Sequence, residues 1–275
     1  MLYVCPTPIG NLGDITLRVL ETLQRVDLVA AEDTRRTAQL LSHFDISKPL
    51  LSFFEHNELR RLPELLDHLR AGRDIALVSD AGMPGISDPG YTLIHSALDE
   101  GLAVEVLPGP SSIETALVSS GFPADSFLFR GYLPRKKGEL RRALEEIAAS
   151  GRTCVTFESP RRLRHTLVEA ETITGMGHIA VCRELTKRFA EIKRGPASVL
   201  LENLPDNIKG EIVLVFAPAE QTDLTTTDRR QLERAVRELQ AEGLSTRRVA
   251  ELVSFFTGAP RRKVYDMALR LKEEH

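Results

Sequence analysis

Residues 79–90, SDAGMPGISDPG, hold the side chains of this sequence that are best suited to chemistry. Two aspartates, Asp80 and Asp88, stand among glycines and prolines, between an apolar run that predicts a buried strand and a run that predicts a helix. Glycine lets backbone groups approach a ligand closely, and proline fixes the shape of a loop beforehand. A connection this rich in turn residues predicts a ligand-binding loop. Asp80 is its strongest candidate because no helix begins directly after it.

Four further loops follow apolar runs and are rich in glycine, proline or acidic residues: PTPIGNLGD, AEDTRR, FEHNE and PGPSS. In open α/β sheets, ligands bind outside the carboxyl ends of the strands, which is where these loops would lie. The sequence contains neither G-x-G-x-x-G nor G-K-[ST]. A dinucleotide site or a P-loop nucleotide site is therefore disfavoured.

Several of these residues also have a structural interpretation. Asp14 and Asp88 each precede a predicted helix, so we expect both to act as N-caps. Ser111 and Glu114 have the spacing of a capping box, S-x-x-E. These interpretations explain the residue types without any ligand.

The first part of the chain alternates short apolar runs with helical periodicity, which predicts βαβ units and a parallel sheet in residues 1–120. The expected strands are 2–7, 27–32, 49–54, 74–79 and 103–109, and the expected helices are 14–26, 34–44, 62–72, 89–101 and 110–121.

The pattern changes after residue 121 and predicts a second α/β domain with a mixed sheet in residues 121–218. Its expected strands are 126–133, 153–159, 178–184 and 211–216, and its expected helices are 138–150 and 160–173. Residues 219–228 have almost no core-forming side chains and are predicted to be a linker. Residues 229–275 are predicted to form three helices, over 229–243, 245–258 and 260–274.

The composition is that of an ordinary globular protein, with 42% hydrophobic and 27% charged residues among 275. No apolar run approaches the length of a membrane span, and the N-terminal residues lack a basic secretory region. Cys5, Cys154 and Cys182 lie in apolar stretches and form no CxxC, so we expect buried, reduced thiols and a cytoplasmic protein. The seven histidines are scattered, and we expect no metal requirement.

The charge distribution is uneven. Residues 130–164 contain ten lysines and arginines and four acidic residues. Residues 1–129 contain nine lysines and arginines and eighteen acidic residues. The basic block includes RKKGELRR and SPRRLRH and predicts either an anion-facing surface or solvated helix faces.

Eight motifs in order resemble one known family: PTPIGNLGDITLR, AAEDTRRT, EHNE, VSDAGMPGISDPGY, LPGPSS, ESPRRL, RELTK and KGE. The sequence resembles the ribosomal RNA small subunit methyltransferase I family, within the tetrapyrrole methylase superfamily. The resemblance runs from about Leu2 to the strand after Glu211, and the tail resembles the family's helix-turn-helix segment. Met83 departs from the family's usual threonine. The resemblance implies two α/β domains of tetrapyrrole-methylase type, a cofactor cleft between them and a small C-terminal helical segment.

The resemblance further implies S-adenosylmethionine as the cofactor, bound in the cleft between the domains. The residues at the matching positions are Pro8, Gly10, Ser79, Asp80, Ala81, Gly82, Ile86, Ser87, Pro110, Ser111, Ser112, Leu133 and Ser159.

The implied reaction is in-line methyl transfer to the ribose 2′-hydroxyl of a cytidine in small-subunit ribosomal RNA. A positioned base would assist this weak nucleophile by roughly 10²–10⁴-fold. The candidates are His56, Glu32, Asp33 and Glu158, with Glu58 and Glu184 as further acidic side chains of the motifs. His56 comes first because an ordinary histidine pKa lies near neutrality, although a histidine bonded within its own loop fits equally well.

The expected partner is small-subunit ribosomal RNA or the assembled small subunit, bound by a homodimer. The candidate RNA contacts are Arg35, Arg135, Lys136, Lys137, Arg162, Arg183, Lys187, Arg261, Arg262 and Lys263. Two other interpretations stay open: a small-molecule tetrapyrrole methylase of the same fold, and a non-catalytic RNA-binding ribosome-assembly factor.

Overall fold

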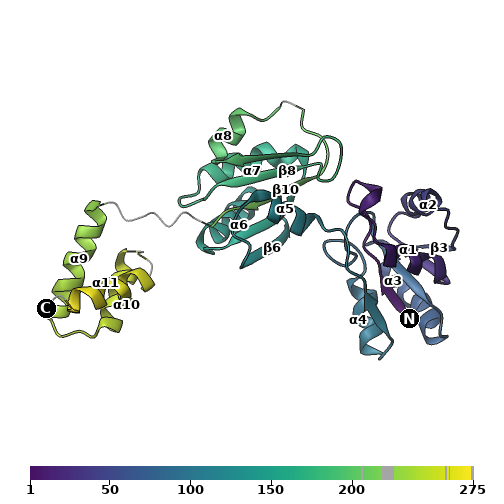
Figure 1. Cartoon of the computed structure of the whole chain (residues 1–275), viewed down its shortest axis with the longest axis horizontal. Coiled ribbons are helices and arrows are strands. Elements are labelled where there is room, and N and C mark those ends of the chain that lie inside the picture. The colour runs from purple at the N-terminus through teal and green to yellow at the C-terminus, as the bar shows by residue number, and fades with distance from the viewer. Residues whose placement is uncertain (206, 219–225, 258, 260, 274–275) are drawn as a thin grey trace. The chain divides into compact units, whose positions relative to one another are not determined.

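The computed structural model describes residues 1–205, 207–218, 226–257, 259 and 261–273 (Figure 1). The chain divides into two compact units, Met1–Glu220 and Gln221–His275. Each is described here by itself. Among the described residues, no helix is both long and apolar enough to cross a lipid bilayer.

The first unit begins with a five-stranded sheet in the order β3-β2-β4-β1-β5. Its strands are β1 (Leu2–Val4), β2 (Leu28–Ala31), β3 (Leu50–Ser52), β4 (Ile75–Val78) and β5 (Val104–Val106). Every pairing is parallel, and Leu2 of β1 lies opposite both Ile75 of β4 and Val104 of β5. The predicted parallel sheet is confirmed. Because all strands run the same way, the loops that leave their carboxyl ends gather at one edge.

Helices cover both faces of this sheet. They are α1 (Leu17–Arg25) and α2 (Thr34–His43) on one face, and α3 (Glu58–Arg70) and α4 (Tyr91–Asp99) on the other. Successive strand residues point to opposite faces, so Val29 packs towards α1 and α2 while Ala30 packs towards α3 and α4. Both faces are apolar, which explains why the strands appear in the sequence as continuous hydrophobic runs.

The expected helix cap at Asp14 is wrong. Asp14 does not cap α1 but ends the short 3₁₀ helix η1 (Leu12–Asp14). The side chain of Thr16 instead accepts a hydrogen bond from the backbone N–H of Val19, at 3.2 Å, and α1 begins after it. The extra turn shifts the helix start by three residues, which lengthens the loop between β1 and α1.

A second five-stranded sheet has the order β6-β7-β10-β8-β9. Its strands are β6 (Phe127–Tyr132), β7 (Thr153–Glu158), β8 (Ile179–Arg183), β9 (Glu191–Gly195) and β10 (Ile212–Phe216). β6 and β7 are parallel and the other pairs are antiparallel, so the predicted mixed sheet is confirmed. Neither β9 nor the helix after it, α8 (Ala197–Glu202), was predicted. β9 is a short edge strand rich in charged residues, and α8 has only 6 residues.

The two sheets are joined by a shared apolar cluster. Helices α6 (Lys137–Ala149), α7 (Pro160–Glu171) and α8 pack on one face of the second sheet. The other face packs against α5 (Ser112–Ser120), which follows β5 in the chain. In that cluster Ile113 and Leu117 of α5 and Ile9 of the loop after β1 lie with Val213 and Val215 of β10. This contact fixes the loops of the first sheet against the second.

The second unit consists of three helices around a small apolar core. They are α9 (Thr226–Ala241), α10 (Thr246–Thr257) and α11 (Arg261–Glu273). Val236, Val249 and Val264 are buried between them. The three-helix prediction holds, and α9 begins within the expected linker of residues 219–228, of which 219–225 lie outside the described residues.

Candidate functional site

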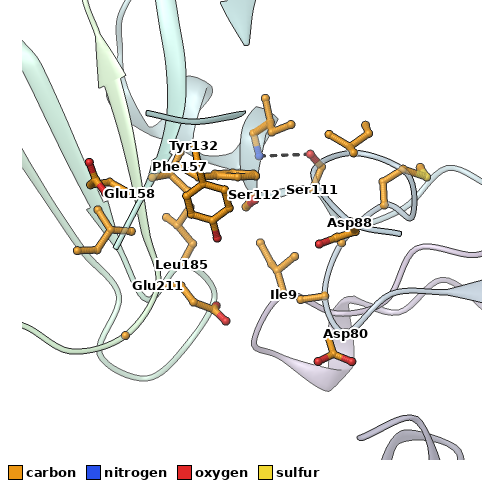
Figure 2. Close-up of a pocket in the computed structure, with 18 of the residues that line it drawn as sticks. Ile9, Asp80, Asp88, Ser111, Ser112, Tyr132, Phe157, Glu158, Leu185 and Glu211 are labelled. Atoms are coloured by element: carbon orange, nitrogen blue, oxygen red, sulfur yellow. Dashed lines mark hydrogen bonds between the residues drawn. The ribbon is translucent and has the colours of Figure 1, made fainter. Parts of the chain in front are cut away.

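A cavity of about 320 Å³ lies between the loops at the carboxyl edge of the first sheet and the adjacent end of the second. Figure 2 shows Asp80, Asp88 and Ser111 on the side of the first sheet and Tyr132, Phe157 and Glu158 on the other. The lining residues are Ile9, Glu32, Arg36, Asp80, Ala81, Gly82, Met83, Ile86, Asp88, Ser111, Ser112, Ile113, Tyr132, Phe157, Glu158, Ser159, Pro160, Leu185, Gly210, Glu211, Ile212 and Val213.

The loops after β1 and β4 are hydrogen-bonded to each other. Thr7 and Gly82 exchange two backbone hydrogen bonds, each 2.9 Å long, and the Thr7 hydroxyl donates to the carbonyl oxygen of Ser79 at 3.0 Å. Gly82 has a φ of +80°, in the region that favours glycine. The loop that carries Asp80 is therefore held in one conformation before any ligand binds.

Asp80 connects the ends of β2 and β4. Its Oδ1 accepts a hydrogen bond from the backbone N–H of Asp33 at 3.1 Å, and its Oδ2 pairs with Nη1 of Arg36 at 3.1 Å. The backbone N–H of Asp80 donates in turn to Oε2 of Glu32 at 3.1 Å. Burial raises the pKa of the Glu32 carboxyl, and the charge of Asp80 adds to the shift. These bonds give Asp80 a structural role between the ends of β2 and β4, and its expected functional role stays a prediction.

Asp88 does not cap α4, contrary to the sequence expectation. The helix begins at Tyr91 after Gly90, whose φ is +132° and whose Cα faces Leu77 so closely that a Cβ would lie 2.9 Å from that side chain. Asp88 therefore stays in the loop and lines the cavity. Burial raises the pKa of its carboxyl to about 7; the charges of Glu32 and Asp80 add to this shift, and a hydrogen bond from Ser79 opposes it. The sequence signal that could have identified Asp88 as a cavity residue is that it is a second aspartate in the loop of Asp80.

The second sheet supplies an aromatic and apolar wall. The rings of Tyr132 at the end of β6 and Phe157 at the end of β7 meet edge to face, with centroids 5.5 Å apart (Figure 2). Leu185, Ile212 and Val213 continue this wall. Tyr132 is 63% exposed, so its ring is accessible from the cavity. Nothing in the sequence pattern separated these aromatic residues from ordinary core residues.

Glu158 lines the cavity, but its carboxylate is already occupied. Oε1 accepts from the backbone N–H of Ser159 at 2.7 Å, and Oε2 accepts from the Thr166 hydroxyl at 2.6 Å. Oε2 also lies 3.4 Å from Nη2 of Arg162, which donates to the carbonyl oxygens of Leu133 and Pro134. These bonds hold the start of α7 against the ends of β6 and β7. The proposed role of Glu158 as base stays a prediction.

An ion-paired loop borders the cavity at Glu211. Nζ of Lys187 lies 2.9 Å from Oε1 of Glu184 and 3.1 Å from Oε2 of Glu211. Gly210 has a φ of +92° and lies directly against the Glu184 carboxyl, so a larger residue there would displace this side chain. Lys187 and these hydrogen bonds lower the pKa of Glu184. This carboxylate is thus an ion-pair partner.

Seven of the thirteen expected cofactor residues line the cavity: Asp80, Ala81, Gly82, Ile86, Ser111, Ser112 and Ser159. Ser111 also caps α5, as predicted, by accepting a hydrogen bond from the backbone N–H of Ile113. The other six do not line it. Pro8 and Ser79 line a neighbouring cavity, and Pro110 lies in an outer groove. Gly10 lies against Lys187, Ser87 beside Gly131, and Leu133 in the core of the second sheet.

Of the remaining candidate bases, Asp33 and His56 are not among the cavity residues. Asp33 caps α2 and pairs with Arg35, whose hydrogen bonds hold the pKa of the Asp33 carboxyl well below its usual range. His56 is exposed, and its ring meets that of Phe54 with centroids 6.2 Å apart. Glu58 accepts a hydrogen bond from the backbone N–H of Thr92 at 3.2 Å.

Most of the expected RNA-contacting residues are paired with acidic side chains. Arg35 pairs with Asp33, whereas Arg36, which the sequence analysis did not select, lines the cavity. Arg135 is exposed. The other pairs are Lys136–Glu139, Lys137–Glu169, Arg183–Glu191 and Arg261–Glu251, and Arg262 and Lys263 follow Arg261 at the start of α11.

The three cysteines are free and buried, as expected, and burial raises the pKa of each thiol. Within the described part of the chain, no group of three or more histidine, cysteine or acidic side chains could hold a metal ion.

Comparison with known families gives two matches. Residues 1–201 match the family described as Tetrapyrrole (Corrin/Porphyrin) Methylases, and residues 226–272 match the RsmI C-terminal HTH domain. Proteins named ribosomal RNA small subunit methyltransferase I are similar over most of the chain. The Synechocystis sp. protein is 41% identical over all of this chain and 99% of its own length, and the Thermotoga maritima protein is 46% identical over 80% of this chain and 99% of its own.

Solved structures show the same fold at low sequence identity. The methyltransferase CobJ superposes with a TM-score of 0.60 and 19% identity, over 79% of this chain and 94% of its own. Uroporphyrin-III C-methyltransferase from Thermus thermophilus, complexed with S-adenosylhomocysteine, superposes with a TM-score of 0.54 and 16% identity, over 78% of this chain and 96% of its own.

Proposed function

Because this chain belongs to the tetrapyrrole methylase family and, within it, to the ribosomal RNA small subunit methyltransferase I proteins, we propose a specific reaction for it. In this proposal the protein methylates a ribose 2′-hydroxyl of a cytidine in small-subunit ribosomal RNA. The methyl donor is S-adenosylmethionine. The observation that carries the proposal is the strongly acidic cavity between the two sheets, which has an aromatic wall.

The charge of the cavity fits a cationic donor. Five carboxylates line it, those of Glu32, Asp80, Asp88, Glu158 and Glu211, against the single guanidinium of Arg36. S-adenosylmethionine carries a sulfonium and an ammonium group, and opposite charges in a partly buried site attract strongly. Burial is the main cause of the raised pKa of Asp88, and the negative charges of Glu32 and Asp80 add to it.

The shape of the cavity fits the nucleoside part of the donor. A volume of about 320 Å³ lies at the lower end of the range of pockets that hold drug-sized molecules. The Tyr132 and Phe157 rings offer an apolar surface for a flat heterocycle (Figure 2), and Ser111 and Ser112 also line the cavity. We place the adenosine against the aromatic wall and the charged groups towards the first sheet.

When bound, the donor supplies a methyl group already activated on sulfur, so the chain's own residues need only align the acceptor and remove its proton. Asp88 is suited to accept that proton. Its carboxyl has a pKa of about 7, so near neutral pH it can both lose and bind a proton. The bound donor would supply the methyl group to the ribose oxygen, and Asp88 would take up the proton of the hydroxyl.

An RNA acceptor is supported by basic and aromatic residues outside the cavity. Arg135, Lys136 and Lys137 follow β6 directly after the aromatic wall. In the C-terminal unit, Phe255 and Phe256 are 82% and 78% exposed at the end of α10, and basic residues begin α11. Exposed aromatic rings beside cationic side chains are typical of surfaces that bind single-stranded RNA.

The role of the C-terminal unit is tested with charge reversal in the full chain. Arg262→Glu at the start of α11 is expected to raise the KM for RNA several-fold, because a phosphate contact is lost and a repulsion is added. Arg234→Glu on α9, also exposed, is the matched control. Equal KM values for both variants would exclude an RNA contact at the start of α11.

A small-molecule tetrapyrrole methylase is the second candidate, since both superposed enzymes have this fold and one is named for a porphyrin substrate. Labelled S-adenosylmethionine offered with small ribosomal subunits lacking the modification, and separately with uroporphyrinogen, decides between them. We expect label in 2′-O-methylcytidine after nuclease digestion and none in the macrocycle. Label in the macrocycle alone would overturn the RNA proposal. The homodimer and the cytoplasmic location stay predictions.

A further inference from the structure

A second cavity of about 230 Å³ adjoins the first. It is built entirely by the first sheet, from the loop after β1, helix α2 and the end of β4. Arg36 and Asp80 line both cavities, so their ion pair forms the boundary between the two. The remaining lining residues are Thr7, Pro8, Leu12, Thr37, Gln39, Leu40 and Ser79.

The walls of this cavity suit a flat ring with a polar edge. Pro8, Leu12 and Leu40 supply apolar surface, and Gln39 on α2 adds an exposed amide with both donor and acceptor atoms. The volume is below the roughly 300 Å³ at which pockets for drug-sized ligands begin. It therefore fits one heterocyclic base and leaves its sugar and phosphates outside.

We propose that this second cavity binds the base of the nucleotide that accepts the methyl group, turned out of its stack in the RNA. The inference rests on the proposed RNA methyltransferase activity and names a separate site for the acceptor. Sequence-specific recognition of RNA reads the edges of bases that are turned out of the stack, and enzymes that act on a base turn its nucleotide out in the same way. A base held here places its ribose at the Arg36–Asp80 boundary, on the side of the methyl-donor cavity.

The Arg36–Asp80 pair at the boundary carries hydrogen-bond donor and acceptor groups that match the edge of a cytosine. A carboxylate accepts from the exocyclic amine of cytosine, and a guanidinium donates to ring nitrogen and carbonyl acceptors. Asp80 is oriented for this by the backbone N–H of Asp33. The Arg36 side chain is 66% exposed, and ion pairs this exposed are weak, so its guanidinium can turn to a base at little cost.

The test uses substitutions in the second cavity that leave the first one unchanged. Gln39→Ala is expected to raise the KM for RNA roughly ten-fold, the effect of losing one base-edge contact. Leu40→Trp fills the cavity and is expected to lower methyl transfer by more, at least roughly a hundred-fold at the same RNA concentration. Both variants should bind S-adenosylmethionine with wild-type affinity. Gln24→Ala on α1, an exposed glutamine outside both cavities, is the matched control.

The outcomes separate this inference from the function on which it rests. Active wild-type protein with an unchanged KM for RNA in Gln39→Ala and unchanged transfer in Leu40→Trp would overturn the acceptor-base site and leave the RNA methyltransferase intact. A loss of S-adenosylmethionine affinity equal to the loss of transfer would assign the second cavity to the donor instead. Wild-type protein that transfers no methyl group to RNA would overturn the proposed function itself.

Discussion

The two sheets of the first unit contribute to the same cavity in different ways. The first sheet supplies charged side chains at its strand ends, with Glu32, Asp80 and Asp88 among loops tied by backbone hydrogen bonds. The second supplies the rings of Tyr132 and Phe157 and an apolar wall (Figure 2). Parallel strands end at one edge and can present several loops together, whereas the mixed sheet presents the ends of its own strands and a helix start.

The difference extends to the carboxylates on each side. Asp88 has a raised pKa and faces the cavity, so it can exchange a proton near neutral pH. Glu158 accepts hydrogen bonds at both oxygens and holds α7 in place. From this contrast we infer that the first side carries the chemistry and the second side carries binding of the donor's ring. Substitutions on the first side should therefore lower the rate of methyl transfer, and substitutions on the second side should raise the Kd for S-adenosylmethionine.

Asp88→Asn should have the largest effect. The amide keeps the size of the side chain but cannot accept the ribose proton, so we expect methyl transfer at saturating substrates to fall by roughly 10²–10⁴-fold. Single-turnover assays measure the rate of methyl transfer, and calorimetric titration measures the affinity for S-adenosylmethionine separately. Asp14→Asn, in η1 outside the cavity, is the control. A rate within a few-fold of wild type would remove Asp88 from the chemistry.

Tyr132→Ala should have a smaller effect and a different signature. Losing the ring is expected to raise the Kd for S-adenosylmethionine roughly ten-fold, in line with the 1–3 kcal/mol of a stacked base, while the saturated rate changes little. Tyr132→Phe keeps the ring and should bind as wild type does. A fall in the saturated rate with unchanged affinity would contradict the division between the two sides.

The effect of Asp88→Asn on the free energy of unfolding should be the smallest of the three, and it should depend on pH. The pKa of Asp88 is about 7 in the folded protein and near 3.8 when unfolded, so the folded state binds the extra proton between these values. Its stability falls as the pH rises from about 4 to 7, and the full loss is present above 7. Because the carboxyl still contacts water, we expect Asp88→Asn to stabilise the protein by only about 1–2 kcal/mol at pH 8 and by almost nothing at pH 4.

Urea unfolding of the wild type and Asp88→Asn at both pH values measures this difference. A variant that is equally stable at pH 8, or stabilised more at pH 4 than at pH 8, would show that the Asp88 carboxyl is not held in an unfavourable environment.

The sequence was sufficient where local pattern and tertiary packing agree. Buried parallel strands read as continuous apolar runs, which located the first sheet and the loop of Asp80. Asp88 was misread because Asp-Pro before a helical pattern is also an N-cap signal, and only the folded chain shows that Gly90 delays the helix start. Arg35 and Arg36 are adjacent in sequence, and only the direction of α2 decides that Arg36 faces the cavity.

The second side of the cavity was less accessible to prediction. Tyr132 and Phe157 lie in strands where aromatic residues are expected for packing alone. Their role depends on which strand ends face the first sheet, and that is set by the cluster joining Ile9, α5 and β10. Such a contact joins residues more than a hundred positions apart and leaves no local pattern.

The most direct test of the account is the pH dependence of single-turnover methyl transfer to small ribosomal subunits at saturating S-adenosylmethionine. The base must be ionised, so the wild-type rate should rise roughly ten-fold per pH unit below about 7 and become constant above it. Asp88→Asn should be slow and lack this rise. A wild-type profile that is flat through pH 7, or the same rise in Asp88→Asn, would contradict the assignment of the chemistry to the first sheet's side of the cavity.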